Sequence, residues 1–144
     1  MRTLTTMDNP LTTLTIKGHF DAAHRMVPAD SPSYERWHGH TYHVELTACL
    51  RRPTYQVTAL DTLRSIWEDK VQSVLDHRPL VCRSDREGCQ LDGAVIFDDP
   101  VTMETLAWHI LDILKKALLE DHQEAKALRV RVSSQPDAYA EASL

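Results

Sequence analysis

The sequence lacks the features that mark membrane and secreted proteins. Its longest apolar stretches, such as residues 94–97, have the length of a strand and fall far short of a membrane helix. It has only three cysteines, at positions 49, 82 and 89, and no CxxC pair, which favours a reducing compartment. The first ten residues lack the basic start and apolar centre of a secretory signal. We therefore expect a cytoplasmic protein that has no membrane partner.

An excess of positive charge is also absent. The 16 Lys and Arg residues are outnumbered by 21 Asp and Glu residues, which gives a formal net charge of −5 with both signs mixed along the chain. Without a basic block to neutralise phosphates, a nucleic-acid partner is not expected. A length of 144 residues fits one domain, residues 1–144, that can bury an ordinary core. The polar residues 1–10 are expected to form a flexible lead-in.

The hydrophobic pattern changes from strand-like to helical at about residue 60. Apolar and polar residues alternate in 11–20, and 37–50 has the same strand character. An i, i+3, i+4, i+7 pattern over 60–75 predicts a helix that ends near Pro79, and 102–118 predicts a second one. Residues 95–97 and 128–134 read as two more strands. The expected fold class is α+β, with an antiparallel four-stranded sheet and two helices on one of its faces.

Histidine, in contrast, is abundant, with eight in the chain and four of them between positions 24 and 43. His38 and His40 are two residues apart in a predicted strand, so both side chains emerge on one face. If the first two strands pair, His24 comes beside them. Three neutral imidazoles leave a fourth tetrahedral position open, which is the layout of a catalytic zinc site. His43 is an odd number of residues from both and is expected on the opposite face.

Asp76 and His77 lie at the end of the first predicted helix. A carboxylate beside a histidine can hold one tautomer, and such a pair suits general acid–base chemistry. A histidine at a helix C-terminus is also explained by its favourable interaction with the helix dipole. The spacing alone leaves both interpretations open.

Four segments, FDAAHR, HGHTYHVEL, LDHRPL and PVTMETLA, occur in an order that resembles the 6-pyruvoyltetrahydropterin synthase / 6-carboxytetrahydropterin synthase family over about residues 14–140. The resemblance implies the tunnelling fold, whose subunits form an oligomeric barrel, usually a homo-hexamer built as a dimer of trimers. It also implies Zn²⁺ held by His24, His38 and His40, and a small-molecule substrate such as dihydroneopterin triphosphate or a related pterin. In the family, the Asp and His that match Asp76 and His77 belong to the catalytic relay.

One departure from the family concerns the catalytic base. The family's catalytic cysteine lies four residues before the first histidine of HGH, where this chain has Tyr34. A phenol, with an ordinary pKa near 10, is a weak base at neutral pH. Some family members use a glutamate instead of the cysteine, which makes the neighbouring Glu35 an alternative. Glu35 is also simply explained as a solvated loop charge.

A second departure lies in the last predicted strand, where the family carries a glutamate–threonine pair that anchors the pterin ring. Ser134 and Gln135 occupy these positions here. A carboxylate can accept two parallel hydrogen bonds from the ring edge and a serine hydroxyl cannot, so pterin recognition is expected to be weaker. Thr102 and Glu104 match the family's T-x-E and are candidate substrate-binding residues, although helix capping explains them equally well.

Three functions are consistent with these residues. The first is a zinc-dependent carbon–oxygen lyase or cyclase of the pterin synthase type, with Asp76 and His77 as the proton relay. The second is a divergent family enzyme that acts on a non-pterin substrate in a specialised pathway. The third is a zinc-stabilised oligomeric binding protein without catalysis. Retention of Asp76 and His77 favours an enzyme.

Overall fold

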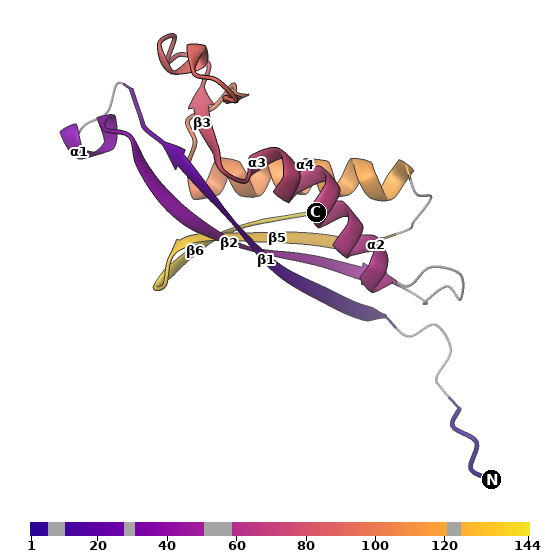
Figure 1. Cartoon of the computed structure of the whole chain (residues 1–144). Helices are drawn as coiled ribbons and strands as arrows, with labels where there is room; N and C mark the ends of the chain where they lie inside the picture. Colours follow the sequence, from indigo (N-terminus) through magenta and orange to yellow (C-terminus); the bar gives the residue numbers. More distant parts are fainter. Residues whose placement is uncertain (6–10, 28–30, 51–58, 121–124) are drawn as a thin grey trace.

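The computed structural model describes residues 1–5, 11–27, 31–50, 59–120 and 125–144. One six-stranded sheet forms the framework, in the order β4-β3-β1-β2-β5-β6 (Figure 1). Its centre is an antiparallel pair of long strands, β1 (Thr12–His24) and β2 (His38–Leu50), which are in register along their whole length. Two antiparallel strands extend the β2 side: β5 (Ala127–Gln135) and β6 (Ala138–Ser143). Two parallel strands extend the β1 side: β3 (Arg78–Cys82) and β4 (Val95–Phe97).

The α+β prediction is confirmed, but the sheet has six strands where the sequence suggested four, and two of its pairings are parallel. The missed strands are β3 and β6. β3 has five residues, follows the preceding helix closely and includes a proline, so its pattern merged with the helix end. β6 reads AYAEAS, and its alanines lack the β-branched side chains that mark a strand.

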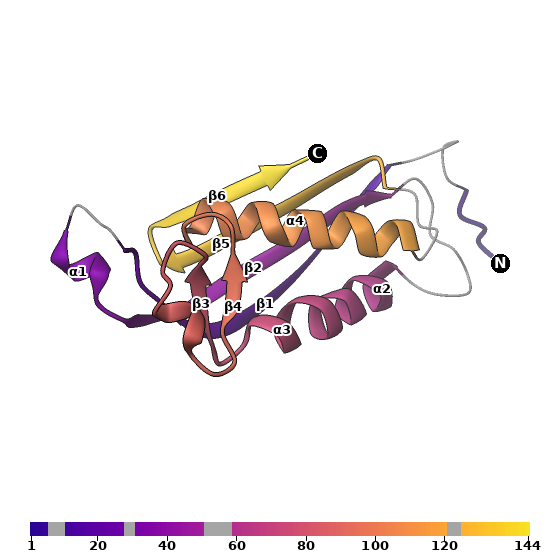
Figure 2. The same cartoon turned by 90° about the horizontal axis from the view of Figure 1, so that it is seen from above.

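Two helices cover one face of the sheet, as expected (Figures 1 and 2). The first combines α2 (Ala59–Ile66), a π-helical turn η1 (Trp67–Gln72) and α3 (Ser73–Leu75). The second is α4 (Met103–Glu120). Their apolar sides meet the inner face of the sheet in one core, in which Phe20, Leu46 and Ile110 are fully buried.

Two short helices lie outside this layer. α1 (Pro32–Glu35) sits in the connection between β1 and β2, at the far end of that hairpin from the chain's N-terminus (Figure 1). The 3₁₀ turn η2 (Gly88–Gln90) lies in the connection between β3 and β4. Both therefore stand at the end of the sheet where β1 finishes and β2 begins, which is the end that carries the histidines.

Gly18 sets how closely the first helix approaches the sheet. A Cβ atom at this position would lie 2.3 Å from the indole of Trp67, which is buried. No side chain fits between the strand and this ring, so glycine is required here by close approach. Gln72, at the end of η1, donates a hydrogen bond to the carbonyl of His19 at 3.1 Å and joins the same two elements.

Candidate metal centre and acid–base pair

The pairing of β1 with β2 brings three histidines together at the end of the hairpin. His24 lies directly opposite His38, and His40 lies opposite Ala22, so all three side chains share the helix-covered face. Their ring centroids are 4.4–5.1 Å apart. One ring nitrogen from each lies within 4.8 Å of the others, a spacing at which the three could hold one metal ion. The predicted ligand set is thus assembled within a single chain.

Backbone carbonyls fix the tautomers of two of these histidines. Nδ1 of His24 is 2.8 Å from the carbonyl oxygen of Val101, and Nδ1 of His38 is 2.8 Å from that of Arg36. Because a carbonyl only accepts, both Nδ1 atoms carry the proton and both Nε2 atoms keep a lone pair. Nε2 of His24 is buried and has no hydrogen-bond partner among the described residues. Metal-binding histidines are typically held in this way by their second nitrogen.

The surroundings favour the neutral form of two of these histidines, His24 and His40. Burial lowers the pKa of His24 from 6.5 to about 4, against the opposing effect of the Val101 carbonyl, and the proximity of His38 and His40 contributes in the same direction as burial. Burial, with a smaller effect from His38, also lowers the pKa of His40. A neutral imidazole is the form that donates to a metal. Three such nitrogens fit a zinc ion that keeps a fourth position open.

His43 lies on the opposite face of β2, as the alternation predicts. It is exposed, and its ring pairs with that of His19 across the β1–β2 ladder at 6.0 Å. These two histidines do not join the candidate metal centre.

Asp76 and His77 form a corner between α3 and β3. Nδ1 of His77 is 3.0 Å from Oδ2 of Asp76, and the other carboxylate oxygen accepts the backbone N–H of Asp21 at 2.9 Å. This N–H bond lowers the pKa of Asp76 against the opposing effect of burial, and the contact with His77 acts in the same direction as the N–H bond. The backbone N–H of His77 donates in turn to the carbonyl of Asp21 at 2.7 Å. Both predicted relay residues are therefore attached to β1, the strand that carries His24.

A surface depression of about 690 Å³ is lined by one residue from each cluster. His40 of the metal centre and His77 of the corner both line it, together with Asp21, Thr41 and Trp37. The hydroxyl of Thr41 donates to the carboxylate of Asp21. A small molecule in this depression would lie against His40 and His77.

The candidate bases lie at the edge of this arrangement. Tyr34 and Glu35 are on α1 and both are exposed, Tyr34 by 54 %. The carbonyl of Tyr34 accepts the N–H of Met26, which closes the α1 connection back onto the end of β1. Arg36 and Trp37 separate Glu35 from His38 along the chain.

The candidate substrate-binding residues at the start of α4 have distinct surroundings. Thr102 and Thr105 cap the helix reciprocally, since the hydroxyl of each accepts the backbone N–H of the other at 3.2 and 3.0 Å. The capping interpretation therefore accounts for Thr102. Val101, which holds His24, directly precedes it, so this cap lies close to the metal centre. Glu104 is exposed in the first turn.

Ser134 is half-buried near the end of β5, and its backbone N–H lies 3.4 Å from the sulfur of Met103. The neighbouring pair in the β2–β5 ladder joins His43 to Ser133. Ser134 thus sits beside the strand of the metal ligands and close to the start of α4. The side chain at this position is small and neutral.

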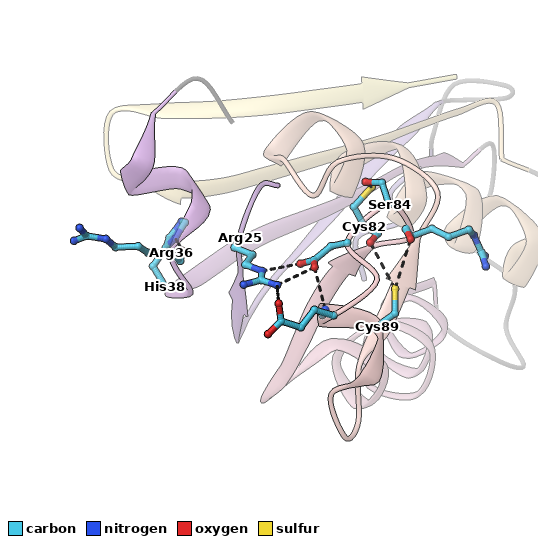
Figure 3. Close-up of polar contacts among 10 residues, drawn as sticks. Arg25, Arg36, His38, Cys82, Ser84 and Cys89 are labelled. Carbon is cyan, nitrogen blue, oxygen red and sulfur yellow. Dashed lines mark hydrogen bonds and ion pairs between the residues drawn. The ribbon is translucent and has the colours of Figure 1, made fainter. Parts of the chain in front are cut away.

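The structure adds residues that the sequence did not single out. Arg25, next to His24, makes two hydrogen bonds of 2.7 and 2.8 Å to the buried carboxylate of Asp85 in the β3–β4 connection (Figure 3). This contact lowers the pKa of Asp85, whose carboxylate also accepts the N–H of Gly88 at 3.0 Å. The Arg25 guanidinium lies 4.9 Å over the ring of Trp37. In the sequence, this loop is marked only by its charge-rich residues 84–87, SDRE, and these do not indicate that Asp85 pairs with Arg25.

The fold and the site together define a mixed α+β protein with a curled sheet and a candidate three-histidine metal centre at the end of a hairpin. The chain belongs to the 6-pyruvoyl tetrahydropterin synthase family, whose model matches residues 13–143. No curated protein sequence matches this chain. Within its described residues, no helix is both long and apolar enough to cross a membrane.

Solved structures of the family share the fold at low sequence identity. A catalytic-residue mutant of the Plasmodium vivax 6-pyruvoyltetrahydropterin synthase is 18 % identical, with a TM-score of 0.74 over 94 % of this chain and 98 % of that chain. The Plasmodium falciparum enzyme is also 18 % identical, with a TM-score of 0.71 over 94 % and 99 % of the two chains. The Caenorhabditis elegans enzyme is 18 % identical, with a TM-score of 0.63 over 95 % and 98 %.

Proposed function

We propose that this protein is a zinc-dependent carbon–oxygen lyase or cyclase that acts on dihydroneopterin triphosphate or a related small molecule. His24, His38 and His40 are the proposed metal ligands, and Asp76 and His77 the proposed proton relay. The observation that carries the proposal is the orientation of the imidazoles. Two have Nδ1 tied to a carbonyl, and the buried Nε2 of His24 is left without a partner in the described chain. Family membership supports the reaction class.

Each group has a distinct role in this proposal. Bound zinc would supply a Lewis acid that polarises a substrate hydroxyl or carbonyl. Asp76 holds Nδ1 of His77, so that Nε2 of the imidazole is the atom that takes up or releases a proton. The depression lined by His40 and His77 is the proposed substrate site. Asp21 positions the relay through its two backbone hydrogen bonds.

The second base is proposed to be Glu35, with Tyr34 as the alternative. The Plasmodium vivax relative was solved as a variant in which a catalytic glutamate is replaced by alanine, so a glutamate serves that enzyme. Glu35 is a carboxylate on α1, just before the strand that carries His38 and His40. Carboxylates are deprotonated at neutral pH, unlike a phenol, which favours Glu35 over Tyr34 as the proton acceptor.

A related substrate other than a standard pterin is the second candidate, and Ser134 favours it. With serine in place of the anchoring glutamate, the amino-pyrimidine edge of a pterin loses a paired carboxylate contact. Such a loss is expected to weaken recognition by about 2–4 kcal/mol, which corresponds to roughly thirty- to a thousandfold. Thr102 and Glu104 remain proposed lining residues near this position.

The oligomer is also part of the proposal. Both β4 and β6 are edge strands, and β1 pairs with β3 only over residues 22–24. Unpaired strand edges favour association with further copies of the chain. We expect a homo-hexamer, a dimer of trimers, and light scattering at micromolar concentration measures it directly; a mass near 16.4 kDa would contradict it. The three unpaired cysteine thiols support a cytoplasmic location.

The deciding experiment incubates zinc-loaded protein with dihydroneopterin triphosphate and follows triphosphate release and pterin products by mass spectrometry. Turnover that disappears in His77→Gln supports the lyase. Slow wild-type turnover that rises in the double variant Tyr34→Cys, Ser134→Glu supports the divergent enzyme. Binding of the pterin without any product, in the wild type and in the double variant, would instead identify a non-catalytic binding protein.

A further inference from the structure

A buried tyrosine that contacts two of the three histidines has no role in the function proposed above. Tyr42 follows His40 by two residues on β2, so its side chain lies on the same face of the sheet as the candidate ligands. It is 1 % exposed, and its hydroxyl has no hydrogen-bond partner among the residues that the structure describes. A buried hydroxyl without a partner costs free energy, so its presence requires a reason.

Packing does not require this hydroxyl. The ring of Tyr42 stacks on Phe20, its direct cross-strand partner, with ring centroids 5.1 Å apart. Phe20 is itself fully buried, so this layer of the core accepts a ring without a polar atom. A phenylalanine at position 42 would keep the stacking and avoid the cost of burying the oxygen.

Two imidazoles of the candidate metal centre contact the ring of Tyr42. The ring centroid of Tyr42 lies 5.6 Å from that of His40 and 6.2 Å from that of His24, and both contacts are edge-on. Nε2 of His24 is a second buried polar atom at this place without a partner in the described chain. These two unsatisfied polar atoms lie on paired strands, and they are explained together if the acceptor binds a metal ion and the donor binds a ligand of that ion.

We propose that the Tyr42 hydroxyl donates a hydrogen bond to the oxygen ligand in the open position of the metal centre. This inference rests on the proposed function, because it assumes a metal held by His24, His38 and His40. A phenol keeps its proton at neutral pH and is therefore a donor to a hydroxylate or carbonyl oxygen. Tyr42 would then favour ligands that bind the metal through oxygen, because a metal-bound oxygen keeps a lone pair that can accept the phenol's hydrogen bond. Ligands whose metal-binding atom has no further lone pair would gain nothing from Tyr42.

The test uses the protein loaded with Co²⁺, whose visible absorption reports on ligands at the metal. Acetohydroxamate, which binds through oxygen, and imidazole, which binds through nitrogen, are titrated into wild type and Tyr42→Phe. We expect the Kd of acetohydroxamate to rise about tenfold in the variant, the usual effect of one lost hydrogen bond, while that of imidazole stays within about twofold. Tyr139→Phe, at an exposed tyrosine on β6, is the matched control and should change neither.

A second measurement separates ligand binding from a structural role. Thermal unfolding of the metal-free proteins should show no decrease in Tm for Tyr42→Phe, because the variant loses only an unpaired hydroxyl. An unchanged Kd for acetohydroxamate would overturn the inference, and so would a Tm lower by several degrees, which reveals a partner in the folded chain. Wild type that binds no Co²⁺ would overturn the metal centre itself, whereas wild type that binds Co²⁺ normally leaves only the role of Tyr42 in question.

Discussion

His24, in the three-histidine cluster, is 9 % exposed, whereas the side chain of His77, in the corner between α3 and β3, is 76 % exposed. Both imidazoles have Nδ1 held by an acceptor, but the acceptor of His24 is a neutral carbonyl and that of His77 is a carboxylate. A carbonyl partner and burial favour a neutral metal ligand. A carboxylate partner and exposure suit a group that exchanges protons.

The three-histidine cluster and the Asp76–His77 corner also differ in how far the residues of one chain enclose them. The histidine cluster takes all three ligands from a single strand pair and a carbonyl from the start of α4. The Asp76–His77 corner is joined to β1 by backbone hydrogen bonds and faces solvent on its other side. The candidate metal centre is therefore assembled within one chain, whereas the Asp76–His77 corner is open to solvent.

The largest expected effect is on the metal. His38→Ala and His40→Ala each remove one of three imidazoles, so near-complete loss of bound zinc is expected. Metal analysis after dialysis measures this directly. His43→Ala, on the opposite face of the same strand, is the matched control and should retain zinc. Full zinc occupancy in either of the first two variants would remove the basis for the centre.

Substitutions in the Asp76–His77 corner should lower activity without lowering the zinc content. His77→Gln and Asp76→Asn are expected to lower kcat by about a hundred- to a thousandfold, the usual contribution of a positioned acid or base, while zinc content is unchanged. Steady-state kinetics on whichever substrate is turned over, with metal analysis of the same samples, provides both quantities. Loss of zinc together with activity would show that the two regions are not separate.

The buried ion pair of Arg25 and Asp85, which joins the end of β1 to the β3–β4 connection, should stabilise the folded protein. Asp85→Ala removes the buried carboxylate from the Arg25 guanidinium, which is 16 % exposed, and leaves it the more distant Glu87 at 3.8 Å, so a loss of about 2–3 kcal/mol in the free energy of unfolding is expected. Asp98→Ala breaks the pair with Arg83, whose two side chains are 69 % and 78 % exposed, and should cost about 1 kcal/mol or less. Urea unfolding of both variants makes the comparison, and equal losses would contradict it.

Acid should weaken the metal-free protein through His24. The folded-state pKa of about 4 lies below the ordinary 6.5, so the unfolded chain binds the extra proton between these values. The stabilisation from the neutral imidazole is complete above pH 6.5 and is lost as the pH falls towards 4. A decrease of about 3 kcal/mol is expected from this residue. His24→Gln should flatten that part of the stability profile, which urea unfolding at several pH values can measure.

Much of the site could be predicted because it depends on strand periodicity. The i, i+2 spacing of His38 and His40 determined their common face, and the odd spacing of His43 determined its separation from them. The strand β6 could not be predicted, because its alanine-rich sequence carries little strand signal, although it pairs with the preceding β5. The strand β3 could not be predicted, because it pairs with β1, more than fifty positions away. The Arg25–Asp85 pair spans sixty positions and was hidden for the same reason.

The register of the first hairpin has a consequence for folding. In the observed ladder His24 faces His38, and a slip of one residue would turn His38 and His40 to the side of the sheet opposite His24. The histidine cluster therefore forms in the observed register of β1 and β2 and not in a register shifted by one residue. A metal ion added during refolding would stabilise only those chains whose β1–β2 hairpin has the native register. The amount of metal bound during refolding would therefore report the fraction of molecules in which this hairpin has formed correctly.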